Sequence, residues 1–204
     1  MKQLIDFFCN PYAKATAFQI TLEIVAVFFG IVSVLYAKKE NIRVFPTGIV
    51  STVLYVYICY EFTLYGDMVI NLYYTLMSFY GWYVWNHKLL GQSIEITTSN
   101  SLDMLKALGI FISTAAFVVG VYLYYDRFDR VTDYFDTFTS GIFFAGMWLM
   151  AHKKIEHWMF WILGNLISIP LYFVKGLGFS GLQFTIFLIL AVQGYIEWKK
   201  HLNK

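Results

Sequence analysis

The sequence predicts an all-α integral membrane protein, with seven transmembrane helices in a 3+1+3 parallel-repeat arrangement. Three observations lead to this fold class: an apolar composition, seven apolar stretches of spanning length, and a pattern that recurs between the two halves of the chain. The 204 residues are 59% hydrophobic and 14% charged, whereas a soluble domain carries about 25% charged residues. Aromatic residues make up 21% of the chain, and membrane proteins place them at interfaces and around ligands.

The charged, cysteine and histidine residues argue against several classes of function. The formal net charge is +2 and the basic residues occur in short clusters, so we expect no nucleic-acid partner. Cys9 and Cys59 form no CxxC or Cys/His spacing, so we expect no disulfide framework, metal or other cofactor. No HExxH or Ser-His-Asp pattern predicts an enzyme. Four histidines fall near the ends of spans, where an imidazole is more often solvated than a ligand: His87, His152, His157 and His201.

The first 16 residues are expected to form an interfacial helix. Apolar residues from Met1 to Phe8 lie on one helical face before Pro11. Asp6 and Asn10 interrupt this segment, so it does not read as a cleavable signal peptide.

Seven spans follow. A membrane helix needs about 20 mostly apolar residues, because lipid cannot satisfy an open backbone N–H or C=O. Each stretch is bounded by charges or by Gly and Pro. The stretches are 17–37, 44–60, 68–86, 107–124, 134–151, 158–174 and 176–196. They divide the chain into a first three-helix repeat (17–88), a linker with the fourth transmembrane helix (89–132), and a second three-helix repeat with a tail (133–204).

The basic residues predict the orientation, because Lys and Arg concentrate on the cytoplasmic side of a membrane. The side that holds the first, third and fifth loops and the tail carries ten of them, and the other side carries five. The N-terminus is therefore expected outside and the C-terminus in the cytoplasm.

An internal repeat links the first and last three spans. The third span ends in the motif Gly-aromatic-x-x-Trp at 81–85, and the seventh repeats it at 194–198. Upstream, Ala37-Lys38-Lys39 resembles Ala151-His152-Lys153. The offset between these two segments is one residue larger than the offset between the two Gly-aromatic-x-x-Trp motifs. The fourth span restores the direction of the chain, so the repeats are expected to be parallel and related by an axis along the membrane normal.

Helix-loosening residues fall in the two corresponding middle spans. Pro46 and Gly48 lie in the second span, and Gly164 and Pro170 lie in the sixth. They are expected either to act as hinges for gating or to allow close helix packing, and the sequence leaves both open.

Two polar and aromatic stripes mark the predicted binding site, because helical spacing puts each stripe on one face. On the third span the stripe consists of Asp67, Asn71, Tyr74, Ser78, Gly81 and Trp85. On the sixth span it consists of Trp158, Trp161, Asn165, Ser168 and Tyr172. With the larger of the two repeat offsets, Ser51 in the second span corresponds to Asn165 in the sixth and is expected to lie opposite it. These groups either contact a solute, with Asn71 and Asn165 foremost, or hydrogen-bond between helices.

Two carboxylates fall inside spans toward the outer side. Glu23 lies in the first span and Asp136 in the fifth, so they occupy corresponding places in the two repeats. They are candidates for attracting a cationic solute or for proton coupling. The alternative is that both are hydrated near the surface.

Three motifs together resemble the PnuC family of vitamin transporters. They are Tyr80-Gly81-Trp82-x-x-Trp85, the run from Glu156 through Trp158, Trp161 and Asn165 to Tyr172, and Gly194-Tyr195-x-x-Trp198. The resemblance implies import of the NAD precursor nicotinamide riboside across the bacterial inner membrane, in a SWEET-like fold and a homotrimer. It implies facilitated diffusion, with trapping by a cytosolic nicotinamide riboside kinase.

The same resemblance assigns a binding role to Trp158, Trp161, Asn165 and Tyr172. The family often has Gln at the position of Asn71, so this shorter residue departs from the pattern. The chemistry agrees, because Trp faces attract a pyridinium cation by roughly 0.5 to 2 kcal/mol. Amides and hydroxyls suit the ribose and carboxamide groups.

Three alternatives remain open at this point. Another B vitamin such as thiamine or riboflavin would fit a pocket that differs in few residues. A channel would conduct without saturating, and a haem or quinone enzyme would be coloured.

Overall fold

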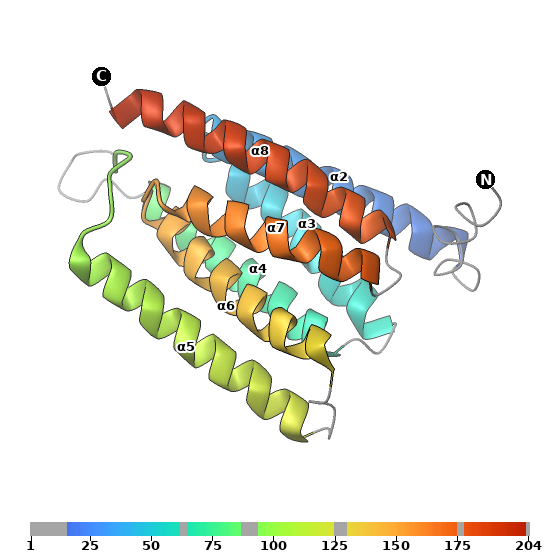
Figure 1. The fold of residues 1–204 in the computed structure, drawn as a ribbon. Coiled ribbons are helices and arrows are strands. Elements are labelled where there is room, and N and C mark those ends of the chain that lie inside the picture. The colour runs from blue at the N-terminus through green and yellow to red at the C-terminus, as the bar shows by residue number, and fades with distance from the viewer. Residues whose placement is uncertain (1–15, 62–64, 87–93, 125–129, 175–177, 203–204) are drawn as a thin grey trace.

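Seven long helices make up the part of the chain that the structure describes. The computed structural model describes residues 16–61, 65–86, 94–124, 130–174 and 178–202. The helices alternate in direction along the bundle (Figure 1). Their bounds are α2 Ala17–Lys38, α3 Val44–Glu61, α4 Tyr65–Asn86, α5 Ser101–Tyr124, α6 Val131–Ala151, α7 His157–Val174 and α8 Gly178–Leu202. The predicted interfacial helix at 1–16 lies almost wholly outside the described residues.

Five of the seven helices are long and apolar enough to cross a membrane, by length and composition: α2, α3, α5, α7 and α8 from Ser180 onward. The other two, α4 and α6, are more polar. In α6 the polar residues Asp133, Thr137 and Thr139 are buried, because α5 and α7 pack against this helix. A helix that neighbours shield from lipid does not need an apolar surface all round.

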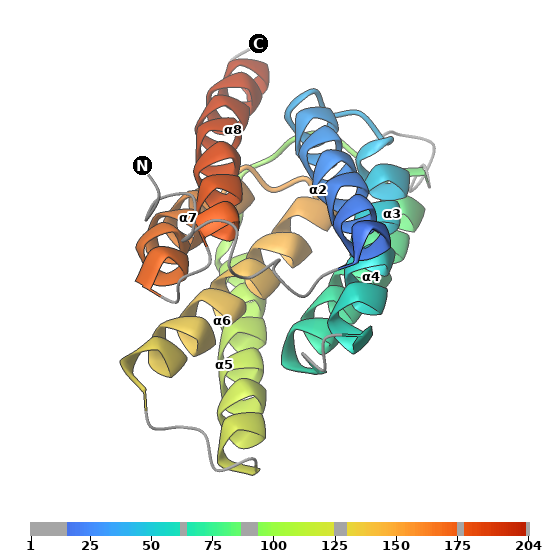
Figure 2. The same ribbon diagram turned by 90° about the vertical axis from the view of Figure 1, so that its right-hand side faces the viewer.

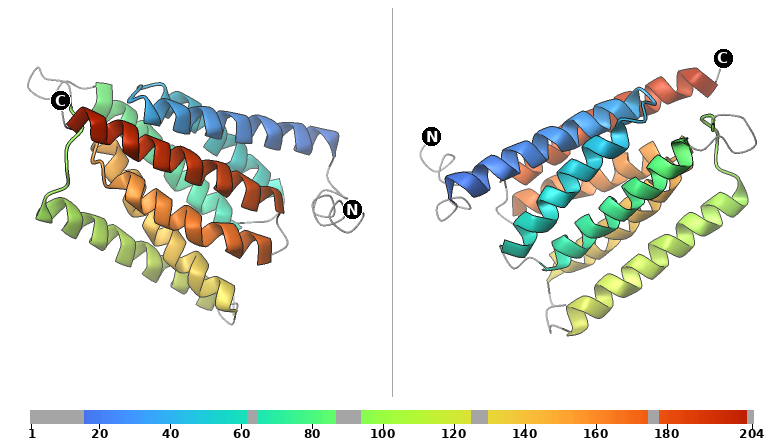
Figure 3. Two further views of the ribbon diagram at one scale, coloured as in Figure 1. Left: turned by 45° about the horizontal axis from the view of Figure 1, so that its top comes forward. Right: turned by 180° about the vertical axis from the view of Figure 1, so that it is seen from behind.

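The helices form two groups of three. In the first helix group α2 packs against α3 and α3 against α4, and in the second helix group α6 packs against α7 and α7 against α8. Contacts between α2 and α8 and between α4 and α6 join the groups, while α5 packs against α6. Figure 2 shows the groups side by side with α5 at the edge of the second group, and both views of Figure 3 place α5 outside the bundle.

The same backbone turn ends α2 and α6. Glu40 and Lys153 have left-handed φ values of 54° and 51°. The next amides, of Asn41 and Lys154, donate to the carbonyls of Tyr36 and Leu149 at 2.9 and 3.0 Å. This pattern is the Schellman motif, which satisfies the open carbonyls at the end of a helix. Both turns lie at one end of the bundle, called the turn end below.

The middle helix of each group, α3 or α7, carries a large aromatic ring near its start, and this ring lies against a glycine of the next helix. The ring of Phe45 in α3 occupies the space where Gly81 of α4 would carry a Cβ, and Trp158 of α7 does the same at Gly194 of α8. Phe45 also meets Trp85 edge-to-face at 5.0 Å between ring centroids, and Trp158 meets Trp198 in the same way at 5.8 Å.

These equivalent features share one offset along the chain. Glu40 and Lys153 are 113 residues apart, which is the offset of the Gly-aromatic-x-x-Trp motifs. The match of Ala37 with Ala151 is therefore one residue out of register with the backbone. In the register of the turns Ser51 corresponds to Gly164, whereas the predicted offset pairs Ser51 with Asn165, and that pairing stays a prediction.

The segment before α5 is held against the second turn. The Thr97 amide donates to the Lys153 carbonyl at 3.1 Å, and the Ile155 amide donates to the Thr97 carbonyl at 3.0 Å. The Ser99 amide and hydroxyl donate to one carboxylate oxygen of Glu156 at 2.9 and 2.7 Å. Ile96 is buried in the core of the turn end. The linker is thereby fixed to the second helix group.

Candidate functional site

The predicted stripes of α4 and α7 face the inside of the bundle, except for Asp67, whose side chain lies outside the described part of the structure. On α4 Ser78 is buried, whereas Leu76 and Phe79 are exposed. On α7 Trp158, Asn165 and Ser168 are buried, and an opposite line is exposed, made up of Met159, Leu163, Leu166 and Phe173. The exposed lines suit lipid. The inward faces therefore bring amides, hydroxyls and aromatic rings together inside the bundle.

Asn165 is the polar group with the clearest site chemistry. Its side chain is only 3% exposed, and its amide has no hydrogen-bond partner among the residues that the structure describes. Buried amides ordinarily have partners. An inward amide that no protein group satisfies is the kind of group that fixes the orientation of a polar ligand.

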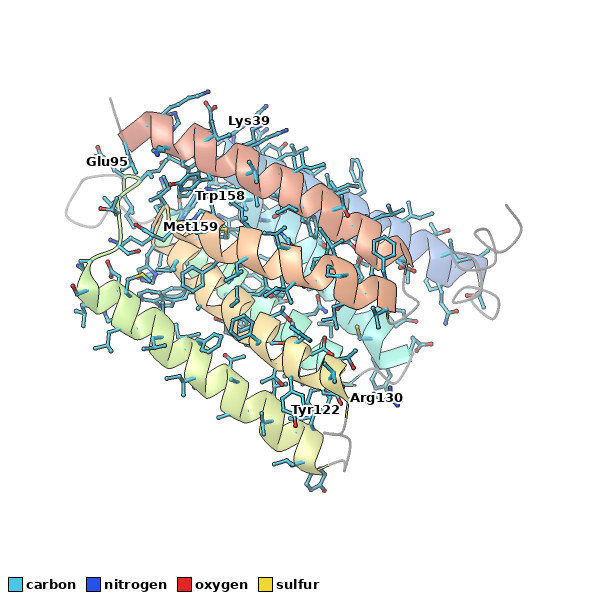
Figure 4. All side chains as sticks on the ribbon, viewed as in Figure 1. Lys39, Glu95, Tyr122, Arg130, Trp158 and Met159 are labelled. Atoms are coloured by element: carbon cyan, nitrogen blue, oxygen red, sulfur yellow. The ribbon has the colours of Figure 1, made fainter. Side chains whose placement is uncertain are left out.

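An aromatic cluster adjoins this position on the turn-end side. The imidazole of His157 lies 4.4, 5.1 and 4.7 Å, between ring centroids, from Trp158, Trp161 and Trp198. The expectation that His157 is solvated is wrong, because this residue has no exposed surface. Figure 4 places Trp158 between α7 and α8. The indole of Trp161 lies against Gly146 of α6, where a Cβ would come within 2.8 Å of it.

Further along α7, rings from both helix groups meet. The phenol group of Tyr74 on α4 lies near that of Tyr172 on α7. Tyr74 also contacts Phe144 of α6 at 5.6 Å, and Tyr172 contacts Phe184 of α8 at 4.8 Å. Tyr74 and Tyr172 therefore line one interior region, as their stripes predict.

Two predicted contact residues have different outcomes. The Ser51 hydroxyl donates to the Ala26 carbonyl at 2.8 Å in a buried bond between α2 and α3. Ser51 thus joins helices, which is the alternative that the sequence left open. Asn71 is half-buried and its backbone carbonyl accepts from Thr75, so direct contact with a solute stays a prediction.

Two of the four predicted hinge candidates, Pro46 and Gly164, lie in different settings. Pro46 is in the first turn of α3, where its missing N–H costs no helical hydrogen bond. Gly164 lies where a Cβ would come 2.6 Å from the Phe143 ring. Gly164 therefore serves close packing, and a gating role for either residue stays a prediction.

The two intramembrane carboxylates lie away from the turn end. Asp136 accepts from the Tyr122 hydroxyl of α5 at 3.4 Å. Glu23 of α2 lies near Tyr55 of α3, which donates to Gln183 of α8 at 3.4 Å. In Figure 4 Tyr122 and Arg130 lie at the end of the bundle opposite Trp158. Both carboxylates therefore belong to polar contacts between helices, and their role in coupling is untested.

Several interior residues were missed by the stripes. His157 shares the helical face of Trp161 and Asn165 at steps of four, so the spacing alone could have predicted that His157 faces inward. Phe143, Phe144 and Phe184 come from two other helices. Their neighbours are decided by packing, so no local pattern marks them.

A bundle of spanning helices that encloses amides, hydroxyls and aromatic rings is the arrangement of a membrane transporter for a polar solute. The comparisons with known proteins give the family. The sequence model of the family described as nicotinamide mononucleotide transporter matches residues 20–200. The resemblance to the PnuC family is thereby confirmed. The chain belongs to this family of membrane transporters.

The similar proteins are also transporters. The nicotinamide riboside transporter PnuC of Neisseria mucosa is 30% identical over 187 residues, which cover 86% of this chain and 71% of the relative. The Escherichia coli protein of the same name is 21% identical, with 87% and 84% covered. The riboflavin/roseoflavin transporter RibM of Streptomyces davaonensis is 27% identical, with 60% and 58% covered. The crystal structure of the vitamin B3 transporter PnuC superposes with a TM-score of 0.69 at 24% identity, with 89% and 82% covered, and shows a shared fold.

Proposed function

We propose that this protein carries nicotinamide riboside across the bacterial inner membrane. The observation that carries the proposal is the inward Asn165 amide, which is 3% exposed and has no hydrogen-bond partner among the described residues. The aromatic rings of Trp161 and Tyr172 flank it on the same face of α7. The PnuC relatives of Neisseria mucosa and Escherichia coli, which match most of the chain, are named as nicotinamide riboside transporters.

In this proposal all seven helices cross the membrane as 3+1+3. The first repeat is 17–88, the linker with the fourth span is 89–132, and the second repeat is 133–204. The equivalent turns at Glu40 and Lys153 and the reciprocal contacts of α2 with α8 and α4 with α6 support this division. The turn end carries Lys38, Lys39, Lys153 and Lys154, which supports a turn end in the cytoplasm and an N-terminus outside.

The charge distribution favours the riboside over the mononucleotide. Among the residues that the structure describes, every Lys and Arg lies in a turn or close to a helix end. A buried phosphate needs paired cations or several donors, whereas a pyridinium cation needs aromatic faces. The interior of α4 and α7 supplies the second chemistry.

Transport is proposed to be facilitated diffusion. A cytosolic nicotinamide riboside kinase would trap the solute, because the added phosphate charge cannot return through this interior. Three copies would assemble as a homotrimer, each with its own pathway. Neither an ion gradient nor ATP is part of the proposal.

Counterflow in liposomes tests the substrate. Protein-containing vesicles loaded with unlabelled nicotinamide riboside should accumulate labelled riboside transiently. Nicotinamide mononucleotide, thiamine and riboflavin in the same assay should compete weakly or not at all. Counterflow of riboflavin or thiamine without counterflow of nicotinamide riboside would refute the proposed substrate.

Two matched substitutions test the site. Asn165→Ala should weaken riboside binding about tenfold, since a hydrogen bond in a buried site is lost, with little change in thermal stability. Ser33→Ala removes a 2.7 Å bond to the Val44 carbonyl between α2 and α3, so it should lower stability and leave affinity unchanged. Trp161→Ala should also weaken binding. Unchanged affinity in both Asn165→Ala and Trp161→Ala would exclude this site.

A further inference from the structure

Two tryptophan side chains join the helix groups crosswise at the turn end. The Trp198 indole of α8 donates to the Ala37 carbonyl at the end of α2, at 3.0 Å in a buried bond. The Trp85 indole of α4 donates to the Ala151 carbonyl at the end of α6, at 3.2 Å. Each indole therefore comes from the last helix of one group and binds the end of the first helix of the other.

An ion pair between the two equivalent turns adds to these bonds. The Lys153 ammonium lies 2.6 Å from a Glu40 carboxylate oxygen, and the two side chains are 10% and 27% exposed. The same ammonium lies 4.6 Å from the centroid of the Trp85 ring. The paired residues are the non-glycine residues with left-handed φ in the described chain. Such strain persists only where the surroundings hold it, and it is concentrated at switches and functional sites.

The apolar core beneath these contacts draws on both helix groups. It contains Phe45 of α3, Met147 of α6, Trp158 of α7 and Ala191 of α8, all less than 8% exposed. Side chains from the two groups therefore fill the turn end of the bundle. A solute that leaves toward this end must first separate them.

Two buried polar atoms oppose this closure. His157 Nε2 and Trp158 Nε1 have no hydrogen-bond partner among the residues that the structure describes. The His157 Nδ1 donates to the Lys154 carbonyl at 2.7 Å, so that in the neutral ring Nε2 is an acceptor. Trp198 packs against both rings. Opening the turn end would hydrate them, which brings the closed and open states closer in free energy.

We propose that the Trp198–Ala37 and Trp85–Ala151 bonds and the Lys153–Glu40 pair form a latch that closes the turn end between the two helix groups. The latch is the gate on the cytoplasmic side of the proposed pathway, so its place in transport rests on the proposed function. It opens as the groups separate, and it releases the solute at that end.

A buried cysteine reports on the latch without any solute. Ala191 is 1% exposed in the core below the latch. In a background with Cys9 and Cys59 replaced by alanine, Ala191→Cys in purified full-length protein should react slowly with N-ethylmaleimide. Adding Lys153→Met or Trp198→Phe should speed the reaction about tenfold, since losing one charged or buried hydrogen bond shifts a two-state equilibrium by that order.

Lys200→Met is the matched control at the same end. Lys200 pairs with Glu197 at 3.2 Å, but the two side chains are 63% and 39% exposed, so the reaction rate should not change. The charge exchange Glu40→Lys with Lys153→Glu should slow the reaction again relative to either single change. Equal rates in Lys153→Met, Trp198→Phe and Lys200→Met would overturn the latch. If Trp198→Phe fails to fold, the ion-pair variants decide alone. Failure of riboside counterflow would refute the proposed substrate and leave the labelling result standing.

Discussion

Replacing Gly194 with alanine perturbs the contact between α7 and α8 in a way that the structure makes quantitative. The new Cβ would lie 2.5 Å from Cη2 and Cζ2 of Trp158 and 2.7 Å from its Cε2. The Trp158 ring has no exposed surface, and it is enclosed by the rings of His157, Trp161 and Trp198. A rigid ring held on several sides cannot move away cheaply, so the two helices must shift.

The expected cost follows from two opposing effects. Overpacking of a core costs about 1–3 kcal/mol, while replacing a helical glycine by alanine gains about 0.5–1 kcal/mol. The net destabilisation is about 0–2.5 kcal/mol, and we expect the upper half of this range because the Trp158 ring is enclosed. For a chain of this length each kcal/mol lowers the Tm by about 2–4 °C.

Thermal unfolding in detergent, followed by far-UV circular dichroism, measures the effect. The matched control is Gly120→Ala in α5, where an added Cβ meets nothing within 4 Å, and its Tm should stay the same or rise. A Gly194→Ala protein as stable as the Gly120→Ala protein would refute the packing argument.

Three further substitutions have defined outcomes. Glu156→Ala removes the acceptor of both Ser99 hydrogen bonds, so the Tm should fall by about 2–8 °C. The control is Glu95→Ala at an exposed position, which should leave the Tm unaltered. Glu23→Gln should leave riboside counterflow unaltered, because the proposed facilitated diffusion uses no ion gradient, and a loss of counterflow would instead support a coupling role for this carboxylate. Tyr172→Ala should weaken riboside binding about tenfold by loss of a stacking surface, as measured by isothermal titration, and an unchanged dissociation constant would remove Tyr172 from the site.

The helices themselves were largely predictable, because hydrophobicity and helical periodicity are local properties. The stretch predicted at 44–60 is α3, Val44–Glu61, and the stretch at 134–151 is α6, Val131–Ala151. The largest error at a helix start is in α5, which begins six residues earlier than expected. Asn100 and Asp103 exchange side-chain and backbone bonds there at 3.1 and 2.8 Å and cap the helix before its apolar run begins.

The inward face of α7 was also predictable, because Asn165 and Ser168 share a helical face with Trp158 and Trp161. What each residue does on that face was not. Ser51 has the composition of a ligand contact, yet its hydroxyl bonds the Ala26 carbonyl. The choice depends on whether a carbonyl of a neighbouring helix lies within reach, and one sequence does not contain that information.

The sequence by itself determined the class of this protein, the approximate ends of its helices and the faces that avoid lipid, because each depends on residues within a few turns of one another. Only the tertiary structure decided that Glu40 pairs with Lys153, that Trp85 and Trp198 cross between the helix groups, and that His157 is buried. These contacts join residues more than 40 positions apart. Their formation depends on how the helix groups dock, and a one-residue change of register would replace every partner.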